Sequence, residues 1–316
     1  MLKALIIGCS GQDGTYLSRL LVEKGYEVLG VARERRVFPS GGVGEAIDIR
    51  RRRDVYSVLL GFQPDEIYFL AALHHSSEDP PLNDHELIER SLEVNALALN
   101  NVLAGICEEC PRSRLFYAAS SRIFGDPPVT PQNEATAINP LCAYGISKAA
   151  GLQLCRFYRA RRAVFASVGI FYNHESPLRP NQFISKKIAG AAARIGGGSK
   201  EKLIVGDLDA LVDWGYAPDY VLAAWQTLQL DEPGDFVIGS GEVHSVREFA
   251  HAAFAPLGLD WTQHVVEDGA VLTRTSSPAI LCADSAKLRG LTGWRPGLSF
   301  EAMVKRMVEA EVANAA

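Results

Sequence analysis

Hydrophobic and polar positions in the first half of the chain alternate between short apolar runs and stretches with helical spacing. The apolar runs have the length and composition of strands that are buried on both faces. They cover residues 4–7, 26–32, 66–71, 114–120 and 164–171. Apolar residues between them recur at helical spacing, most clearly over 86–109 and 144–162. This alternation predicts an α/β fold of Rossmann type, with a doubly wound parallel sheet.

After residue 172 the alternation loosens, and loop-forming residues fill positions 173–180. Helical spacing then predicts three helices, and two short apolar runs predict strands. The helices are expected at 184–195, 246–255 and 300–312, and the strands at 202–205 and 235–238. We expect residues 1–172 to form a nucleotide-binding domain and residues 173–316 to form mainly a smaller substrate lobe, with some chain returning to the sheet.

Composition narrows the class of protein. The 316 residues are 47% hydrophobic and 22% charged, with a formal net charge of −5, which gives no sign of nucleic-acid binding. No apolar stretch reaches the length of a membrane span. Six scattered cysteines in a chain of this size indicate reduced thiols and a cytoplasmic protein. Cys107 and Cys110 lack a second pair that would complete a zinc site, so no metal is expected.

Three glycines, Gly8, Gly11 and Gly14, lie between the first predicted strand and the first helix. In a dinucleotide-binding loop the first permits a tight turn, the second lets the backbone approach a pyrophosphate, and the third allows close helix packing. The helix N-terminus then faces the anion, and we expect Gln12 and Asp13 to contact the cofactor there. A purely structural glycine loop is the alternative.

The end of the second strand bears on the choice between NAD and NADP. Arg33 lies where the contact to the ribose 2′ position is expected, and a basic group there tolerates a 2′-phosphate. NADP(H) is therefore favoured, while the neighbouring Glu34 keeps NAD(H) open. Asp48 and Ile49 follow the third strand and are expected to reach the adenine, although Asp48 could be an ordinary turn residue.

The strand that ends near residue 71 carries Leu70, Ala71 and Ala72, whose mostly small side chains would let a dinucleotide lie across the sheet. Four residues separate Tyr144 from Lys148, so the two share one helix face. A lysine there can hold a phenol near its anionic form and bind a ribose. The phenol, with its pKa depressed, can then move a proton while a nicotinamide moves a hydride.

Two serines end the strand before this helix. Ser120 is expected to hydrogen-bond a substrate oxygen beside the Tyr144 phenol, and Ser121 is expected near the substrate. Capping of a helix or turn is the alternative role for one of the two.

With these motifs the chain resembles the extended short-chain dehydrogenase/reductase group that modifies nucleotide-sugars, and within it the GDP-mannose 4,6-dehydratase family. The matching segments are residues 11–17, 63–68, 116–117, 171–179, 213–221 and 293–296. The resemblance implies a nucleotide-sugar substrate and a homodimer or homotetramer, with the helices at 86–109 and 144–162 as its seam. It also implies Asn173 near the sugar diphosphate, with Arg179, Lys187 and Arg274 as candidate nucleotide contacts.

Three positions depart from the family pattern. The family carries a threonine, another residue and then a glutamate at the end of the serine-bearing strand, and this glutamate moves protons at C5 and C6 during water loss. Arg122 stands at the glutamate position, and a guanidinium cannot give up its proton near neutral pH. Val212 replaces an arginine used on the diphosphate, and His74 and His75 follow Leu73 where the family has a Gln–Ser pair.

These departures predict a reshaped sugar pocket in which Ser121, Arg122 and His74 meet the substrate. Either of the two imidazoles could act as an acid–base group near neutral pH. A loop histidine bonded to the backbone is the alternative for at least one of them.

From the sequence we expect an NAD(P)-dependent enzyme with hydride chemistry at C4 of a GDP-linked hexose, as a 4-keto reductase or an epimerase. Full 4,6-dehydration is the alternative, which Arg122 opposes. A non-catalytic dinucleotide-binding protein is a second alternative. The intact set of Ser120, Tyr144 and Lys148 argues against it, because sensing a dinucleotide does not need this set.

Overall fold

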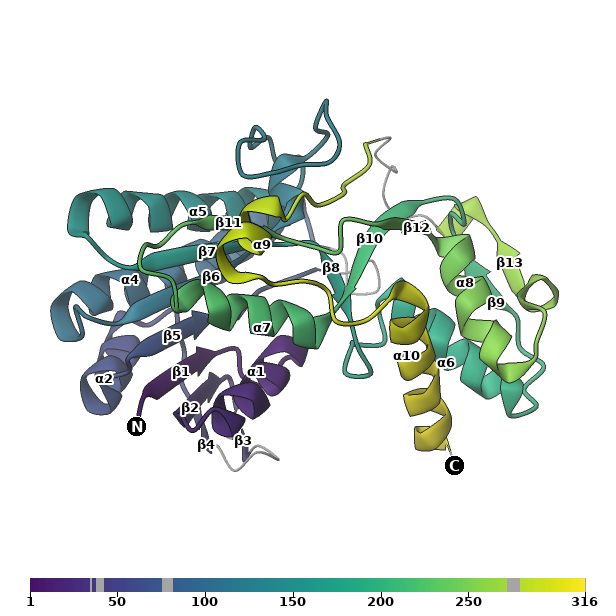
Figure 1. Cartoon of the computed structure of the whole chain (residues 1–316), viewed down its shortest axis with the longest axis horizontal. Helices are drawn as coiled ribbons and strands as arrows, with labels where there is room; N and C mark the ends of the chain where they lie inside the picture. The colour runs from purple at the N-terminus through teal and green to yellow at the C-terminus, as the bar shows by residue number, and fades with distance from the viewer. Residues whose placement is uncertain (35, 38–42, 76–81, 272–278, 316) are drawn as a thin grey trace.

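An eight-stranded sheet forms the centre of the larger part of the molecule (Figure 1). The computed structural model describes residues 1–34, 36–37, 43–75, 82–271 and 279–315. Neighbouring strands are parallel except for one antiparallel pair at the edge, β3 and β4. In spatial order the strands are β11 (Asp235–Ile238), β7 (Ala166–Phe171), β6 (Arg114–Ser120), β5 (Glu66–Phe69), β1 (Lys3–Ile7), β2 (Glu27–Ala32), β4 (Val43–Ala46) and β3 (Arg36–Val37). The predicted Rossmann-type fold is confirmed.

Helices cover both faces of this sheet because successive strand side chains point to opposite sides. Leu5 and Ile7 of β1 belong to the core under one helical layer, whereas Ala4 and Ile6 belong to the core under the other. The first layer contains α2 (Arg52–Phe62), α4 (Ala98–Glu109) and α5 (Ala143–Arg162). The second contains α1 (Gln12–Glu23), α7 (Ala217–Leu228) and α9 (Ala286–Thr292).

The helix predicted over 86–109 is interrupted by a π-helical turn. It consists of α3 (Asp84–Leu92), a π-helix (Glu93–Leu97) and α4. The spacing of apolar residues alone did not reveal this turn, since one extra residue barely disturbs an amphipathic pattern. The π-helical turn contains Asn95, which is fully buried beside the candidate site.

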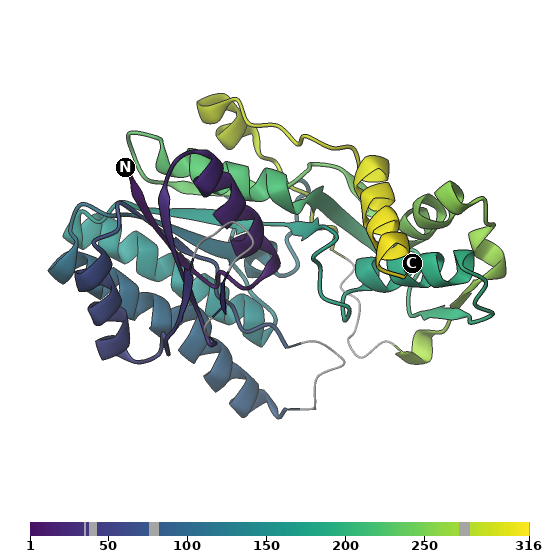
Figure 2. The same cartoon turned by 90° about the horizontal axis from the view of Figure 1, so that it is seen from below.

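A smaller lobe with its own core lies beyond one end of the sheet (Figures 1 and 2). The ring of Trp214 packs between those of Phe249 and Phe300 at centroid distances of 5.0 and 5.9 Å. The lobe contains α6 (Ile184–Gly196), α8 (Val246–Phe254), α10 (Phe300–Ala315), β8 (Asn173–Glu175), β9 (Leu203–Val205), β10 (Leu211–Tyr216), β12 (Val243–Ser245) and β13 (Val265–Glu267). Between these elements the chain returns to the main sheet as β11, next to β7.

Short 3₁₀ helices occupy residues 121–124, 255–257, 261–263 and 269–271. Figure 2 shows the N-terminus on the sheet part and the C-terminus at the end of α10 on the smaller lobe. None of the helices in the described ranges is long and apolar enough to cross a membrane.

Candidate active site

The glycine loop between β1 and α1 leaves no room for side chains at two positions. Gly8 has a φ of +94°, and a Cβ there would lie 2.5 Å from the backbone nitrogen of Ala71. A Cβ on Gly14 would lie 2.5 Å from the carbonyl oxygen of Gly8. Gly11 is the exposed N-cap of α1, and no side chain makes a capping hydrogen bond there. An uncapped helix N-terminus beside glycine backbone fits the pyrophosphate of a dinucleotide.

The loop after β5 lies against this glycine loop. The backbone nitrogens of Leu70 and Ala71 both donate to the carbonyl oxygen of Ile7, each at 2.9 Å. Ala72, the next residue, is exposed. Since β5 lies between β1 and β6 in the sheet, three loops meet at one sheet edge. This edge is where parallel α/β sheets bind their ligands.

Of the residues expected near the adenine end of the cofactor, Arg33 is exposed, whereas Asp48 and Ile49 make contacts within the protein. Arg33 is exposed one residue after the end of β2, and Gly8 donates a backbone hydrogen bond to Val31 of that strand. The Asp48 carboxylate accepts hydrogen bonds from Nε and Nη2 of Arg50, both at 2.9 Å, and from its backbone nitrogen. Asp48 is therefore held in a local turn, and Ile49 packs against the core.

Ser120, Tyr144 and Lys148 come together as expected from the sequence. Ser120 ends β6 and Tyr144 lies in the first turn of α5, and the Ser120 hydroxyl is close enough to have a lowering effect on the pKa of the Tyr144 phenol. The Lys148 side chain is 1% exposed, and its ammonium nitrogen donates to the Ala118 carbonyl oxygen at 2.7 Å. The same nitrogen lies 5.6 Å from the centre of the Tyr144 ring.

The expectation that Lys148 depresses the pKa of the Tyr144 phenol is wrong. Burial raises the pKa of Tyr144 above its ordinary value, against a smaller lowering effect of the Arg179 charge and of the Ser120 hydroxyl. Burial also lowers the pKa of Lys148 to about 7. Removal from water penalises the charged form of each group, and this penalty exceeds the opposing effects of Arg179 and Ser120 on Tyr144 and of Asp13 on Lys148. The neutral phenol is therefore the favoured form of Tyr144.

Ser120 also has the capping role that the sequence left open. Its Oγ accepts a hydrogen bond from the backbone nitrogen of Arg122 at 3.2 Å, at the start of the 3₁₀ helix 121–124. Ser121 is buried, and Arg122 is exposed. The Arg122 backbone abuts α5, since a Cβ on Gly145 would lie 2.5 Å from the Arg122 carbonyl oxygen. The Arg122 backbone therefore lies against the first turn of α5, which contains Tyr144.

Sequence reasoning missed Asn95, which ties two parts of the site together. Its Oδ1 accepts a hydrogen bond from the Leu73 backbone nitrogen at 2.8 Å, and its Nδ2 donates to the Leu73 carbonyl and to the Ser147 hydroxyl. Ser147 in turn donates to the Tyr144 carbonyl oxygen at 2.8 Å. An asparagine at a buried position of an otherwise apolar helix was the available signal.

The imidazole of His74 lies beside Tyr144. The two ring centroids are 5.2 Å apart with the rings edge to face, and the ring of Phe183 lies 5.3 Å from His74 on another side. The guanidinium of Arg179 covers Phe183 at 3.6 Å from its centroid. His74 is nevertheless exposed.

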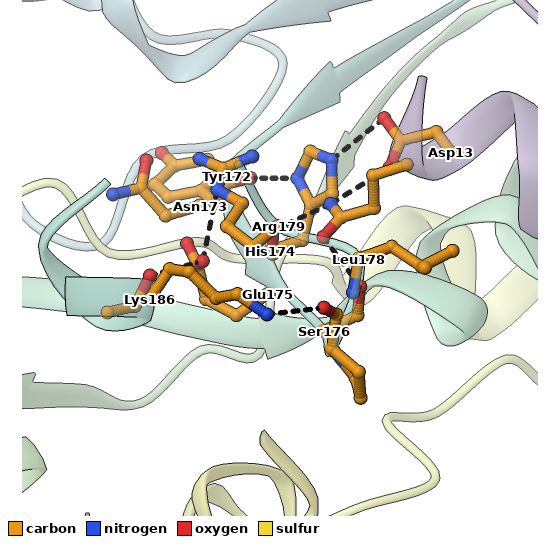
Figure 3. A network of polar contacts seen from close by, with 12 residues as sticks. Asp13, Tyr172, Asn173, His174, Glu175, Ser176, Leu178, Arg179 and Lys186 are labelled. Atoms are coloured by element: carbon orange, nitrogen blue, oxygen red, sulfur yellow. Dashed lines mark hydrogen bonds and ion pairs between the residues drawn. The ribbon is translucent and has the colours of Figure 1, made fainter. Parts of the chain in front are cut away.

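An ion pair joins the glycine loop to the smaller lobe (Figure 3). Asp13 lies 3.0 Å from Nε2 of His174, whose Nδ1 lies 2.8 Å from the Tyr172 carbonyl oxygen. The ring of His174 also stacks on that of Tyr220 at 4.7 Å. Burial disfavours the charged form of both groups. The attraction between the two charges and their hydrogen bonds outweigh this effect, so the pKa of Asp13 is lowered and that of His174 is raised.

Gln12 makes a second link between the same elements. Its Nε2 donates to the His174 carbonyl oxygen at 3.1 Å, and its Oε1 accepts a hydrogen bond from the Ser176 hydroxyl at 2.7 Å. Both side chains that follow Gly11 therefore contact the segment after β7. The sequence suggested cofactor contacts for Gln12 and Asp13, and did not reveal these tertiary partners.

The candidate substrate residues lie on and after β8. Asn173 is exposed at the start of that strand, and Nε of Arg179 lies 3.0 Å from Oε2 of Glu175 (Figure 3). The Arg179 N–H is not aligned for a hydrogen bond, so this contact is an ion pair only. Lys187 is half-buried on α6. Arg274 lies outside the described residues.

Comparison with known proteins identifies the family. The family model for GDP-mannose 4,6 dehydratase matches residues 5–307. The chain is 35% identical to GDP-mannose 4,6 dehydratase 1 of Arabidopsis thaliana over 332 residues, which cover 98% of this chain and 89% of that protein. It is 33% identical to the human GDP-mannose 4,6 dehydratase over 343 residues, with 98% and 91% covered. The chain belongs to the GDP-mannose 4,6-dehydratase family.

Solved structures of other proteins show the same fold. A UDP-glucose 4-epimerase of Thermotoga maritima with UDP-glucose superposes with a TM-score of 0.88 at 19% identity, and all of both chains is covered. RMD from Pseudomonas aeruginosa with NADPH gives 0.84 at 20% identity, covering 99% of this chain and 100% of that one. A dTDP-glucose 4,6-dehydratase of Bacillus anthracis with NAD gives 0.84 at 15%, covering 99% and 97%.

Membership of this family makes the chain an NAD(P)-dependent nucleotide-sugar enzyme of the extended short-chain dehydrogenase/reductase group. The names of the relatives favour dehydration, the alternative of the sequence analysis, over reduction or epimerisation. Two family departures have clear positions here. The Arg122 backbone lies against the first turn of α5, and Val212 lies on β10 paired with His244. Within the described residues, no group of three His, Cys, Asp or Glu side chains could hold a metal ion.

Proposed function

We propose that this chain oxidises C4 of a GDP-linked hexose and then removes water across C5 and C6, as a 4,6-dehydratase. One observation carries the proposal: Ser120, Tyr144 and Lys148 come together at the ligand-binding edge of the sheet, in a chain whose match to a named dehydratase covers 98% of its residues. The choice of GDP and of dehydration rests on the names of the relatives.

The roles of the three residues follow from their positions. Tyr144 exchanges a proton with the C4 oxygen, and Ser120 orients that oxygen by a hydrogen bond. Lys148 lies behind the phenol, where its charge, present in part at neutral pH, stabilises the phenolate during oxidation and where it would hold the nicotinamide ribose. When bound, NAD(P) supplies the hydride acceptor for C4.

The remaining assignments concern binding. Arg33 is the reason to propose a preference for NADP(H) over NAD(H), with Asp48 and Ile49 on the adenine side. Asn173, Arg179, Lys187 and Arg274 are proposed to contact the nucleotide diphosphate of the sugar. A homodimer through the helical segment 86–109 and α5 would cover exposed apolar side chains such as Leu97 and Phe157, which are 58% and 55% exposed.

A second candidate function is reduction or epimerisation of a 4-keto sugar without loss of water. The observation in its favour is Arg122, because a permanently charged guanidinium cannot remove the C5 proton. The same Ser120, Tyr144 and Lys148 would serve this reaction, so the two candidates differ only on the C5 and C6 side of the sugar.

The test is an incubation of the purified chain with GDP-mannose and NADP⁺, followed by mass spectrometry and NMR of the sugar nucleotide. Loss of one water is the expected result. A 4-epimer of unchanged mass, identified by NMR, would support the second candidate, and the absence of any change at C4 would contradict both. The Tyr144→Phe variant should form neither product.

A further inference from the structure

Water loss from a 4-keto sugar needs a group that Tyr144 cannot replace. The C5 proton must be removed, and the C6 hydroxyl must receive a proton before it leaves as water. Arg122 cannot perform either transfer near neutral pH. A second acid–base group is therefore required, and this inference rests on the dehydration proposed above.

Two other ionisable groups near this part of the site are held by contacts within the fold. Both ring nitrogens of His174 have partners, Asp13 and the Tyr172 carbonyl, and the His174 side chain is only 12% exposed. The sulfur of Cys142 caps α5 by accepting a hydrogen bond from the Gly145 nitrogen at 3.4 Å.

His74 differs from them in position and exposure. Its ring lies 5.2 Å from that of Tyr144, while the side chain is exposed. Phe183 supports a second side of the ring, and Asn95 fixes the backbone of the preceding residue, Leu73, with two hydrogen bonds. The loop is thus held so that an imidazole stands next to the phenol.

We propose that His74 is the acid–base group for C5 and C6. C5 and C6 are the next carbons after C4 along the sugar, so a group adjacent to the Tyr144 ring can reach them while the phenol faces the C4 oxygen. Imidazole accepts and returns protons near neutral pH, as this role requires. The resemblance implies only that such a group is needed. The position of His74 beside Tyr144 identifies it as the candidate.

The proton and electron count closes without an external oxidant. Once C4 has lost its hydride and its hydroxyl proton, the imidazole takes the C5 proton. The electron pair of the broken C5–H bond then forms the C5–C6 double bond as the C6 hydroxyl departs. The imidazolium gives its proton to that hydroxyl, which leaves as water. A bound nicotinamide would supply to C6 the hydride taken from C4, and C5 takes up one proton, which balances the proton released from the C4 hydroxyl.

The experiment uses the full chain with GDP-mannose and NADP⁺ in deuterated water. The His74→Phe variant keeps an aromatic ring against Phe183 and Tyr144 but cannot exchange a proton. His75→Gln, a loss of imidazole one position along the same loop, is the matched control. Three quantities are measured: water loss by mass spectrometry, deuterium at C5 by NMR, and a single-turnover rise in the absorbance of the reduced nicotinamide. Binding of NADP⁺ by calorimetry checks that each variant is folded.

We expect His74→Phe to lose water about 10²- to 10⁴-fold more slowly, the usual range for general acid–base catalysis, with an equal loss of C5 deuterium uptake. Its single-turnover oxidation at C4 should stay within about threefold of the wild type, because Tyr144 is unchanged. His75→Gln should resemble the wild type in all three measurements.

Wild-type water loss in His74→Phe would overturn the role of His74. So would C4 oxidation by the wild type with neither water loss nor C5 exchange, a result that would leave the second candidate function standing. No C4 oxidation by the wild type would instead remove the proposed function itself. A His74→Phe variant that no longer bound NADP⁺ would show that His74 acts in the structure, and this also contradicts the proposal.

Discussion

The two sides of the candidate site differ in how firmly the fold holds them. The proposed hydride side, Ser120, Tyr144 and Lys148, is tied to β6, because Lys148 donates to the Ala118 carbonyl oxygen and is almost fully buried. The water-loss side, His74 and Arg122, consists of exposed side chains on a loop and a short 3₁₀ helix. The resemblance implies a glutamate at the position of Arg122, so we propose that similarity over 98% of the chain does not carry every catalytic residue with it. The buried side keeps the family's residue types, and the exposed side departs from them.

The largest effect should follow from removing the proton carrier of the hydride side. Tyr144→Phe keeps the packing of the ring but removes the hydroxyl, and we expect turnover to fall about 10²- to 10⁴-fold. Initial rates with GDP-mannose measure this, and NADP⁺ affinity by calorimetry should change little. If the variant turned over as fast as the wild type, the acid–base group would lie elsewhere, and the distinction between the two sides of the site would not hold.

The next effect concerns the cofactor end of the hydride side. Arg33→Ala should weaken NADP⁺ binding by about 10- to 150-fold, which corresponds to roughly 1.5–3 kcal/mol for a charge-assisted hydrogen bond. NAD⁺ binding should hardly change, because it has no 2′-phosphate. The control is Arg53→Ala, an exposed arginine on α2. Equal losses for both dinucleotides, or a wild type that binds NAD⁺ as tightly as NADP⁺, would refute the assignment.

A smaller effect is expected from the link between the two sides. Asn95→Ala leaves the Leu73 backbone groups and the Ser147 hydroxyl without their partner, and we expect a loss of about 1–3 kcal/mol in the free energy of unfolding. Urea titration followed by circular dichroism measures it. An unchanged midpoint would mean that the loop before His74 is not held by this asparagine.

The smallest effect is a pH dependence of stability from Asp13 and His174. The raised pKa of His174 contributes stability below its unfolded value of 6.5, and this contribution is lost as the pH rises through the folded pKa. The lowered pKa of Asp13 contributes stability above its unfolded value of 3.8, and this is lost as the pH falls through the folded pKa.

Asp13→Asn should therefore lower stability most between about pH 4 and 6.5, by about 1 kcal/mol for this partly exposed pair. The difference from the wild type should shrink above the folded pKa of His174. Thermal melts of the cofactor-free chain across this range measure it. A difference that is the same at every pH would show that the pair contributes no charge interaction.

Sequence patterns predicted the parts of this account that depend on local spacing. The strand at 114–120, the glycine loop and the meeting of Ser120 with Tyr144 follow from period and strand order. Asn95 and the Asp13–His174 pair could not be predicted, because each depends on residues more than 20 positions apart in the sequence. The pKa of Tyr144 was predicted in the wrong direction because burial, which dominates it, is a tertiary property.

The most direct test of the central claim follows the hydrogen at C4. GDP-mannose labelled with deuterium at C4 is converted by the wild-type chain with NADP⁺, and the position of the label is read by NMR. The account predicts that deuterium leaves C4 and appears at C6 of a 4-keto-6-deoxy sugar, because the hydride taken from C4 is returned to C6. Deuterium that remains at C4 in every recovered sugar nucleotide would contradict it.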